Sequence, residues 1–152
     1  MAIKAKFVHT NIVAKDWKKL ARFYEDIFGC IPVPPERNLE GKWLEECTGV
    51  PGAQISGVHL RLPGYDDEGP TLEIFQYSQH EDRPETASNR LGFAHIAFEV
   101  DDVDSARRTV LDAGGKEVGK LVSLDVPEAG TVTLVYLTDP EGNIIELLSW
   151  SK

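Results

Sequence analysis

Two histidines occupy matching places in the sequence and are the first residues that suggest chemistry. His9 lies in the segment KFVH and His95 in the segment GFAH, 86 residues later (95 minus 9). The same offset separates two further pairs of like residues, Asp16 with Asp102 and Gly29 with Gly115. Three matched offsets indicate an internal repeat. Because imidazole nitrogens bind divalent metals, two histidines related by a repeat suggest a metal site around a pseudo-symmetry axis.

Each half of the repeat also ends in an apolar, strand-like segment that carries one glutamate. Glu73 lies in TLEIFQY and Glu146 in IIELLSW, and neither segment contains a lysine or arginine. An unpaired carboxylate buried in such a strand costs several kcal/mol, so each glutamate needs a partner. A structural ion pair would satisfy it. The matched histidines favour a metal site instead, and they predict a donor set of His9, Glu73, His95 and Glu146.

One divalent ion is the expected cofactor, and Ni, Co, Zn, Mn and Fe all accept this mixture of nitrogen and oxygen donors. Four protein ligands leave one or two positions of such an ion open. A small molecule with two adjacent oxygens can chelate the ion there, which polarises its carbonyl group.

A strand, a helix and further strands, repeated once, are expected to position these residues. The first strand of each half is predicted at 7–13 and 93–100, followed by a helix that begins at Asp16 and at Asp101 or Asp102. Later strands are predicted at 54–62, 71–77, 120–122, 131–138 and 144–150. This pattern predicts an α+β chain of two tandem βαβββ modules.

The modules are expected at 1–80 and 90–152, joined by a charged loop at 78–90, within a single domain covering 1–152. Asp139–Asn143 is typical of a turn, so the last two strands should form a hairpin. Prolines at 32, 34 and 35 indicate an irregular stretch, and the glycine- and proline-containing insert at 41–52 is expected to be a loop.

Composition excludes several classes of protein. The 152 residues carry a net charge of −9, which argues against nucleic acid as a partner. No run approaches the roughly 18 apolar residues of a membrane span, and the N-terminus lacks the apolar core of a signal peptide. Cys30 and Cys47 form no CxxC motif and are expected to be reduced, partly buried thiols of a cytoplasmic protein.

These motifs resemble those of the vicinal oxygen chelate superfamily, which includes glyoxalase I, methylmalonyl-CoA epimerase, extradiol dioxygenases and bleomycin-resistance proteins. The motifs are F-V-H followed by D-W, the central L-E-I-F, G-F-A-H-I-A-F-E-V-D-D-V-D, and the terminal D-P-E-G-N-I-I-E-L. The resemblance implies paired modules that form a cupped mixed sheet around the metal, with His9, Glu73, His95 and Glu146 as ligands. It also implies a homodimer.

The ligand pattern is most similar to the glyoxalase I and methylmalonyl-CoA epimerase branches. This similarity implies a divalent-metal-dependent isomerase, epimerase or glyoxalase-like lyase that removes a proton α to a chelated carbonyl. Glu146 is then the first choice as general base. Glu73 either returns the proton from the opposite face or serves only as a metal ligand.

Two other activities are the alternatives. An extradiol-type dioxygenase needs two histidines and one carboxylate with open positions, and Glu73 would fill a position that such enzymes leave free. A non-catalytic binding or resistance protein generally lacks the four ligands, although the charge of −9 agrees with an acidic binding groove.

Two further side chains are candidate substrate contacts. Trp43, in the insert, is expected either to stack on a substrate or to be an aromatic residue of the core. His59, in VHLRL, is expected on a strand, where it either faces the cup or is an ordinary sheet histidine.

Overall fold

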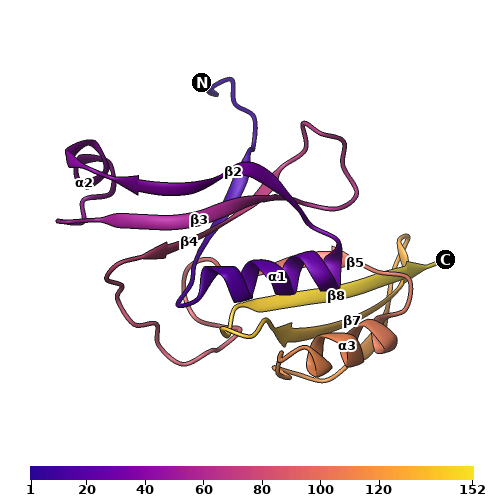
Figure 1. Cartoon of the computed structure of the whole chain (residues 1–152). Coiled ribbons are helices and arrows are strands. Elements are labelled where there is room, and N and C mark those ends of the chain that lie inside the picture. The colour runs from indigo at the N-terminus through magenta and orange to yellow at the C-terminus, as the bar shows by residue number, and fades with distance from the viewer. The chain divides into compact units, whose positions relative to one another are not determined.

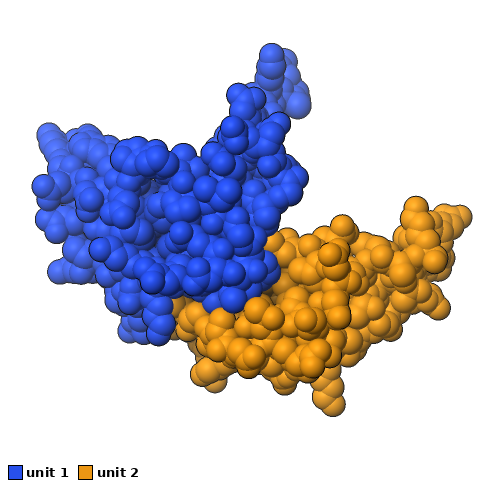
Figure 2. All heavy atoms as spheres, turned by 45° about the vertical axis from the view of Figure 1, so that its right-hand side comes forward, with its two compact units in different colours: residues 1–82 blue, residues 83–152 orange.

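The computed structural model describes residues 1–152, and the chain divides into two compact units. Unit 1 is Met1–Asp82 and unit 2 is Arg83–Lys152, so the boundary falls inside the charged loop predicted at 78–90 (Figure 2). Each unit contains one mixed four-stranded sheet and few helices (Figure 1). The predicted α+β class and the two repeated modules are confirmed. None of the helices has both the length and the apolarity needed to cross a membrane.

Unit 1 has strand order β1-β4-β3-β2, with β1 parallel to β4 and the other pairs antiparallel. Its strands are β1 (His9–Val13), β2 (Ile31–Glu40), β3 (Gln54–Arg61) and β4 (Thr71–Tyr77), and its helices are α1 (Trp17–Phe28) and α2 (Lys42–Thr48).

Helix α1 begins where the sequence predicts and ends at a glycine. The Asp16 carboxylate accepts a hydrogen bond from the Lys19 amide at 3.2 Å, and Gly29 adopts the left-handed conformation (φ 70°) that ends the helix. Leu20 and Tyr24, four residues apart on one helix face, are fully buried. The helix packs through this face against β3 and β4.

The sheet of unit 1 therefore has two different faces. Leu60, Leu72 and Ile74 are fully buried, and they alternate along β3 and β4 with His59 and Glu73. Because successive side chains of a strand point to opposite faces, His59 and Glu73 lie on the face opposite these three residues. Burial of one face thus fixes which residues the other face presents.

Unit 2 repeats this topology, with strand order β5-β8-β7-β6 and β5 parallel to β8. Its elements are β5 (His95–Glu99), α3 (Val103–Asp112), β6 (Val122–Val126), β7 (Gly130–Thr138) and β8 (Ile144–Ser151). Helix α3 packs against β7 and β8, where Leu137, Ile145 and Leu147 are fully buried.

The predicted hairpin between β7 and β8 is confirmed, and hydrogen bonds stabilise its turn. Asp139 is buried and accepts hydrogen bonds from the amides of Glu141 (2.9 Å) and Asn143 (3.1 Å). Arg83 donates to the Asn143 side chain at 2.8 Å, and Thr86 donates to the backbone of the same turn. The start of unit 2 is thereby attached to its last hairpin.

The chain after α1 is more regular than predicted. The stretch that begins at Pro32 forms β2, an edge strand paired with β3, and its register shifts between Val33 and Arg37. Proline has no amide hydrogen to donate, so an edge position with a local irregularity accommodates it. The expectation of an irregular stretch was therefore wrong for most of these residues.

The insert at 41–52 was expected to be a loop, but it contains the short helix α2. Leu44 of this helix packs with Ala53 and Ile55 in a small cluster, so apolar burial stabilises a helix that has no side-chain N-cap. The strand predicted at 120–122 lies instead at Val122–Val126.

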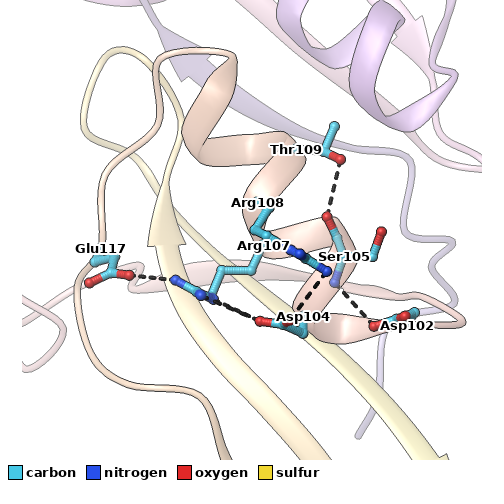
Figure 3. A network of polar contacts seen from close by, with 7 residues as sticks. All are labelled: Asp102, Asp104, Ser105, Arg107, Arg108, Thr109 and Glu117. Carbon is cyan, nitrogen blue, oxygen red and sulfur yellow. Dashed lines mark hydrogen bonds and ion pairs between the residues drawn. The ribbon is translucent and has the colours of Figure 1, made fainter.

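The acidic residues at the start of α3 cap the helix (Figure 3). Asp102 accepts a hydrogen bond from the Ser105 amide at 3.1 Å. Asp104 pairs with Arg107 at 3.3 Å, and Arg107 also contacts Glu117 at 2.6 Å. Negative charge at a helix N-terminus is favourable, so stabilisation of the helix accounts for the acidic residues Asp102 and Asp104.

Replacing the cap residue should destabilise the protein. Asp102→Ala removes a side-chain acceptor from the first turn of α3, and we expect the free energy of unfolding to fall by about 1 kcal/mol in urea denaturation. The control is Asp101→Ala, which removes an exposed carboxylate just outside the cap. Equal stability of the two variants would contradict the capping role.

The two cysteines have different environments. Cys30 is buried, and burial, with a smaller effect of Glu25, raises the pKa of its thiol to about 11. Cys47 is exposed, so the expectation that both thiols are partly buried was wrong for Cys47.

Thiol labelling should distinguish the two cysteines. At pH 8 the Cys30 thiol stays protonated because its pKa lies well above that pH, and the protonated form is a poor nucleophile. We expect iodoacetamide to modify native protein at Cys47 alone, and to modify both residues after unfolding, as measured by peptide mass spectrometry. Rapid labelling of Cys30 in the native protein would contradict its burial.

Candidate metal centre

The four predicted ligands form two histidine–glutamate pairs, one in each unit. In unit 1, the His9 Nε2 atom lies 3.5 Å from the Glu73 Oε1 atom. In unit 2, the His95 Nε2 atom lies 3.0 Å from the Glu146 Oε1 atom. In each case the histidine is on the edge strand and the glutamate is on its parallel neighbour. The equivalence of the pairs follows from the equivalent sheet topology.

Strand register explains why Glu73 is surrounded by polar side chains. The parallel pairing of β1 with β4 places Asn11 opposite Glu73, and the Asn11 amide donates a hydrogen bond to Glu73 Oε1 at 2.8 Å. The antiparallel pairing of β3 with β4 places His59 opposite Glu73 from the other side. Glu73 is only 8% exposed, and these neighbours offset the cost of burying its charge.

His59 is the closest of these neighbours. Its Nε2 atom lies 2.6 Å from Glu73 Oε2, and its Nδ1 atom lies 3.4 Å from the Thr71 hydroxyl oxygen. The His59 ring also meets the His9 ring edge to face, with centroids 5.6 Å apart. The ligand atoms of His9, His59 and Glu73 all lie within 4.8 Å of one another.

The environment of His59 favours its neutral form. Burial lowers the pKa of the imidazole below its ordinary value; the Glu73 carboxylate opposes this shift, while Arg37 and His9 add to it. A neutral imidazole has a free lone pair, which is the form that binds a metal ion.

The corresponding positions in unit 2 hold different side chains. Tyr136 lies opposite Glu146 where His59 lies opposite Glu73, and its ring is 4.8 Å from that of His95. Ala97 takes the place of Asn11. Glu146 forms its ion pair with His95 and has no amide or second imidazole beside it. The two halves therefore have the same strand pairing around the glutamate but different numbers of metal-binding side chains.

The two pairs fit the coordination chemistry of a divalent metal. Ligand atoms that each lie about 2.1 Å from an ion are about 3 Å apart when they occupy adjacent coordination positions. The nitrogen–oxygen distances of 3.5 Å and 3.0 Å are close to that separation. Imidazole and carboxylate together suit Zn, Fe, Ni, Co and Mn. That both pairs bind one common ion stays a prediction.

The two candidate substrate contacts lie in different surroundings. His59 is half-buried beside Glu73, as described above. Trp43 lies on α2 and is 55% exposed, so the alternative of a core aromatic is wrong. Stacking of Trp43 on a substrate stays a prediction.

The sequence analysis did not single out Asn11 and Tyr136, which lie opposite Glu73 and Glu146. Asn11 follows His9 by two residues, which puts both on one face of β1. Tyr136 could be found by counting back across the Asp139–Asn143 turn, because an antiparallel hairpin pairs residues at equal distances from its turn.

The chain matches a protein-family model. The model of the Glyoxalase/Bleomycin resistance protein/Dioxygenase superfamily matches residues 6–147, nearly the whole chain. The chain belongs to this superfamily. The resemblance predicted from the four motifs is thereby confirmed.

Curated relatives are similar along almost their full length. A probable lactoylglutathione lyase of Vibrio parahaemolyticus is 26% identical over 149 residues, which cover 94% of this chain and 89% of the relative. A lactoylglutathione lyase of Haemophilus influenzae is 24% identical, covering 94% and 91% of the two chains. These names support a glyoxalase-like role.

Solved structures share the fold. A glyoxalase family protein from Bacillus cereus aligns with a TM-score of 0.81 over 100% of both chains at 22% identity. A glyoxalase family protein from Enterococcus faecalis aligns with a TM-score of 0.60 at 21% identity, covering 95% of this chain and 98% of that one.

Proposed function

We propose that this protein is a divalent-metal-dependent isomerase, epimerase or glyoxalase-like lyase acting on a small molecule with adjacent oxygen atoms. The observation that carries the proposal is the repeated histidine–glutamate pair, at 3.5 Å in unit 1 and 3.0 Å in unit 2. Membership of the superfamily and similarity to lactoylglutathione lyases support the same class of reaction.

His9, Glu73, His95 and Glu146 would hold the metal. When bound, the cation supplies Lewis acidity that polarises the carbonyl group of a chelated substrate. Polarisation acidifies the neighbouring C–H bond, so a carboxylate close to that carbon can remove its proton. The reaction requires no net oxidation, because a proton is returned to the same or the adjacent carbon.

The surroundings of the two glutamates support different roles for them. Glu73 contacts Asn11, His9 and His59, and these three partners restrain its carboxylate. Glu146 pairs with His95 alone, so fewer contacts have to break before its carboxylate moves toward a substrate. We therefore assign Glu146 as the base that takes the proton, and Glu73 as a ligand that also returns a proton where inversion is required.

We also propose that the protein works as a homodimer in the cytoplasm. Each four-stranded sheet has two edge strands, β1 and β2 in unit 1 and β5 and β6 in unit 2, and edge strands are commonly covered in native assemblies.

Metal dependence is the first test of the function. We expect protein treated with a chelator to lose α-proton exchange, and reloading with one of Ni²⁺, Co²⁺, Zn²⁺, Mn²⁺ or Fe²⁺ to restore it. The measurement is deuterium uptake from D₂O by 2-oxo, 2-hydroxy-carbonyl, malonyl-thioester and glutathione hemithioacetal compounds, followed by NMR. Metal-loaded protein that exchanges none of them, or that instead consumes dioxygen with a catechol, would overturn the proposal.

Substitution of the base is the second test. We expect Glu146→Gln to reduce proton exchange by about 100-fold or more, because general-base catalysis contributes about 10²–10⁴-fold to a rate. Metal content should be measured in the same samples, so that lost binding is distinguished from lost proton transfer. The control is Glu128→Gln, which changes an exposed carboxylate in the turn before β7. Unchanged exchange in metal-loaded Glu146→Gln protein would refute the assignment.

A further inference from the structure

The two histidine–glutamate pairs have unequal surroundings, and one difference lies directly opposite each glutamate. Opposite Glu73 on the adjacent antiparallel strand is His59, and opposite Glu146 is Tyr136. Unit 1 thus presents two imidazoles and one carboxylate on three neighbouring strands, β1, β4 and β3. Unit 2 presents one imidazole and one carboxylate beside a phenol ring.

We propose that unit 1 binds a divalent cation by itself, with His59 as the third ligand beside His9 and Glu73. The proposal rests on the proposed function only in taking His9 and Glu73 as ligands. It adds a donor outside the repeated set, and it makes the half-site of unit 1 sufficient without His95 and Glu146.

The geometry of the cluster supports three-point binding. The ligand atoms of His9, His59 and Glu73 lie within 4.8 Å of one another, so small side-chain rotations suffice to bring all three to bonds of about 2.0–2.2 Å with a common ion. His59 Nε2 is 2.6 Å from one Glu73 oxygen, and His9 Nε2 is 3.5 Å from the other. The two imidazoles therefore approach the carboxylate from different strands.

The neighbours of the cluster orient its donors. The Thr71 hydroxyl lies 3.4 Å from His59 Nδ1, on the side of the ring away from Glu73, which leaves Nε2 facing the carboxylate. Asn11 holds Glu73 Oε1 at 2.8 Å. Partners of this kind fix the orientation of metal ligands in proteins and raise the affinity of the site. In unit 2 the residues at the equivalent register positions, Ile144 and Ala97, cannot form such hydrogen bonds.

Two imidazoles and one carboxylate suit first-row transition metals. Unit 1 is therefore expected to retain such an ion when the pair in unit 2 is disabled. Tyr136 lies at the position equivalent to His59, which provides a matched control.

Co²⁺ titration of the full chain, followed by its visible absorption and by calorimetry, tests the proposal. We expect the double variant His95→Ala/Glu146→Gln to bind one Co²⁺ per chain, with a Kd within about tenfold of that of the unaltered protein. Adding His59→Phe to that variant should weaken binding by more than about 100-fold, the upper end of the loss seen for residues that only support a ligand. Adding Tyr136→Phe instead should leave the Kd unchanged.

The proposal is overturned if the double variant binds no Co²⁺, or if His59→Phe leaves its affinity unchanged. Circular dichroism confirms that each variant is folded, and NMR of ¹⁵N-histidine in the unaltered protein gives an independent measurement. Zn²⁺ should shift the Nε2 resonance of His59 as strongly as that of His9, and an unshifted His59 resonance would also overturn the proposal.

Failure of this inference can be distinguished from failure of the proposed function. If His59 is required for binding but the metal-loaded protein exchanges no α-protons, the function fails and the metal site stands. If exchange needs all four predicted ligands while His59→Phe protein keeps both metal and activity, the function stands and this inference fails.

Discussion

Glu73 is a carboxylate buried at the centre of a sheet, and the cost of removing its charge from water constrains the whole of unit 1. A charge in that position is stable only with partners on the neighbouring strands. The pairing of β4 with β1 and β3 supplies them, because it places Asn11 and His59 directly opposite. Burial of the opposite sheet face under α1 then prevents a slip of register, since a shift by one residue would turn Glu73 into the core.

The sequence was sufficient to predict the parts of the site that the repeat duplicates. His9 and His95 were identified from an offset that two other residue pairs share, and Glu73 and Glu146 from their positions in apolar, strand-like segments. Their approach to within 3.5 Å within each module follows from the parallel pairing of β1 with β4 and of β5 with β8. The helix caps at Asp16 and Asp102 could also be predicted, because a cap depends on only three or four consecutive residues.

Features that depend on long-range pairing were not predictable in the same way. The strand that begins at Ile31 contains prolines, which usually break strands, and only an edge position beside β3 makes it stable. Helix α2 is short and lacks a side-chain N-cap, and tertiary contacts of Leu44 stabilise it. The position of His59 next to Glu73 likewise depends on the β3–β4 register, which an isolated histidine in an apolar segment does not reveal.

The contrast between His59 and Tyr136 has an evolutionary consequence. Codons for histidine and tyrosine differ by a single base, so one nucleotide substitution is enough to interchange them. His59 and Tyr136 occupy equivalent cross-strand positions, and the same backbone pairing accommodates either ring. A duplicated module can therefore gain or lose a metal-binding side chain while its sheet stays the same. Few mutations are then needed for the two halves of the chain to take on different roles.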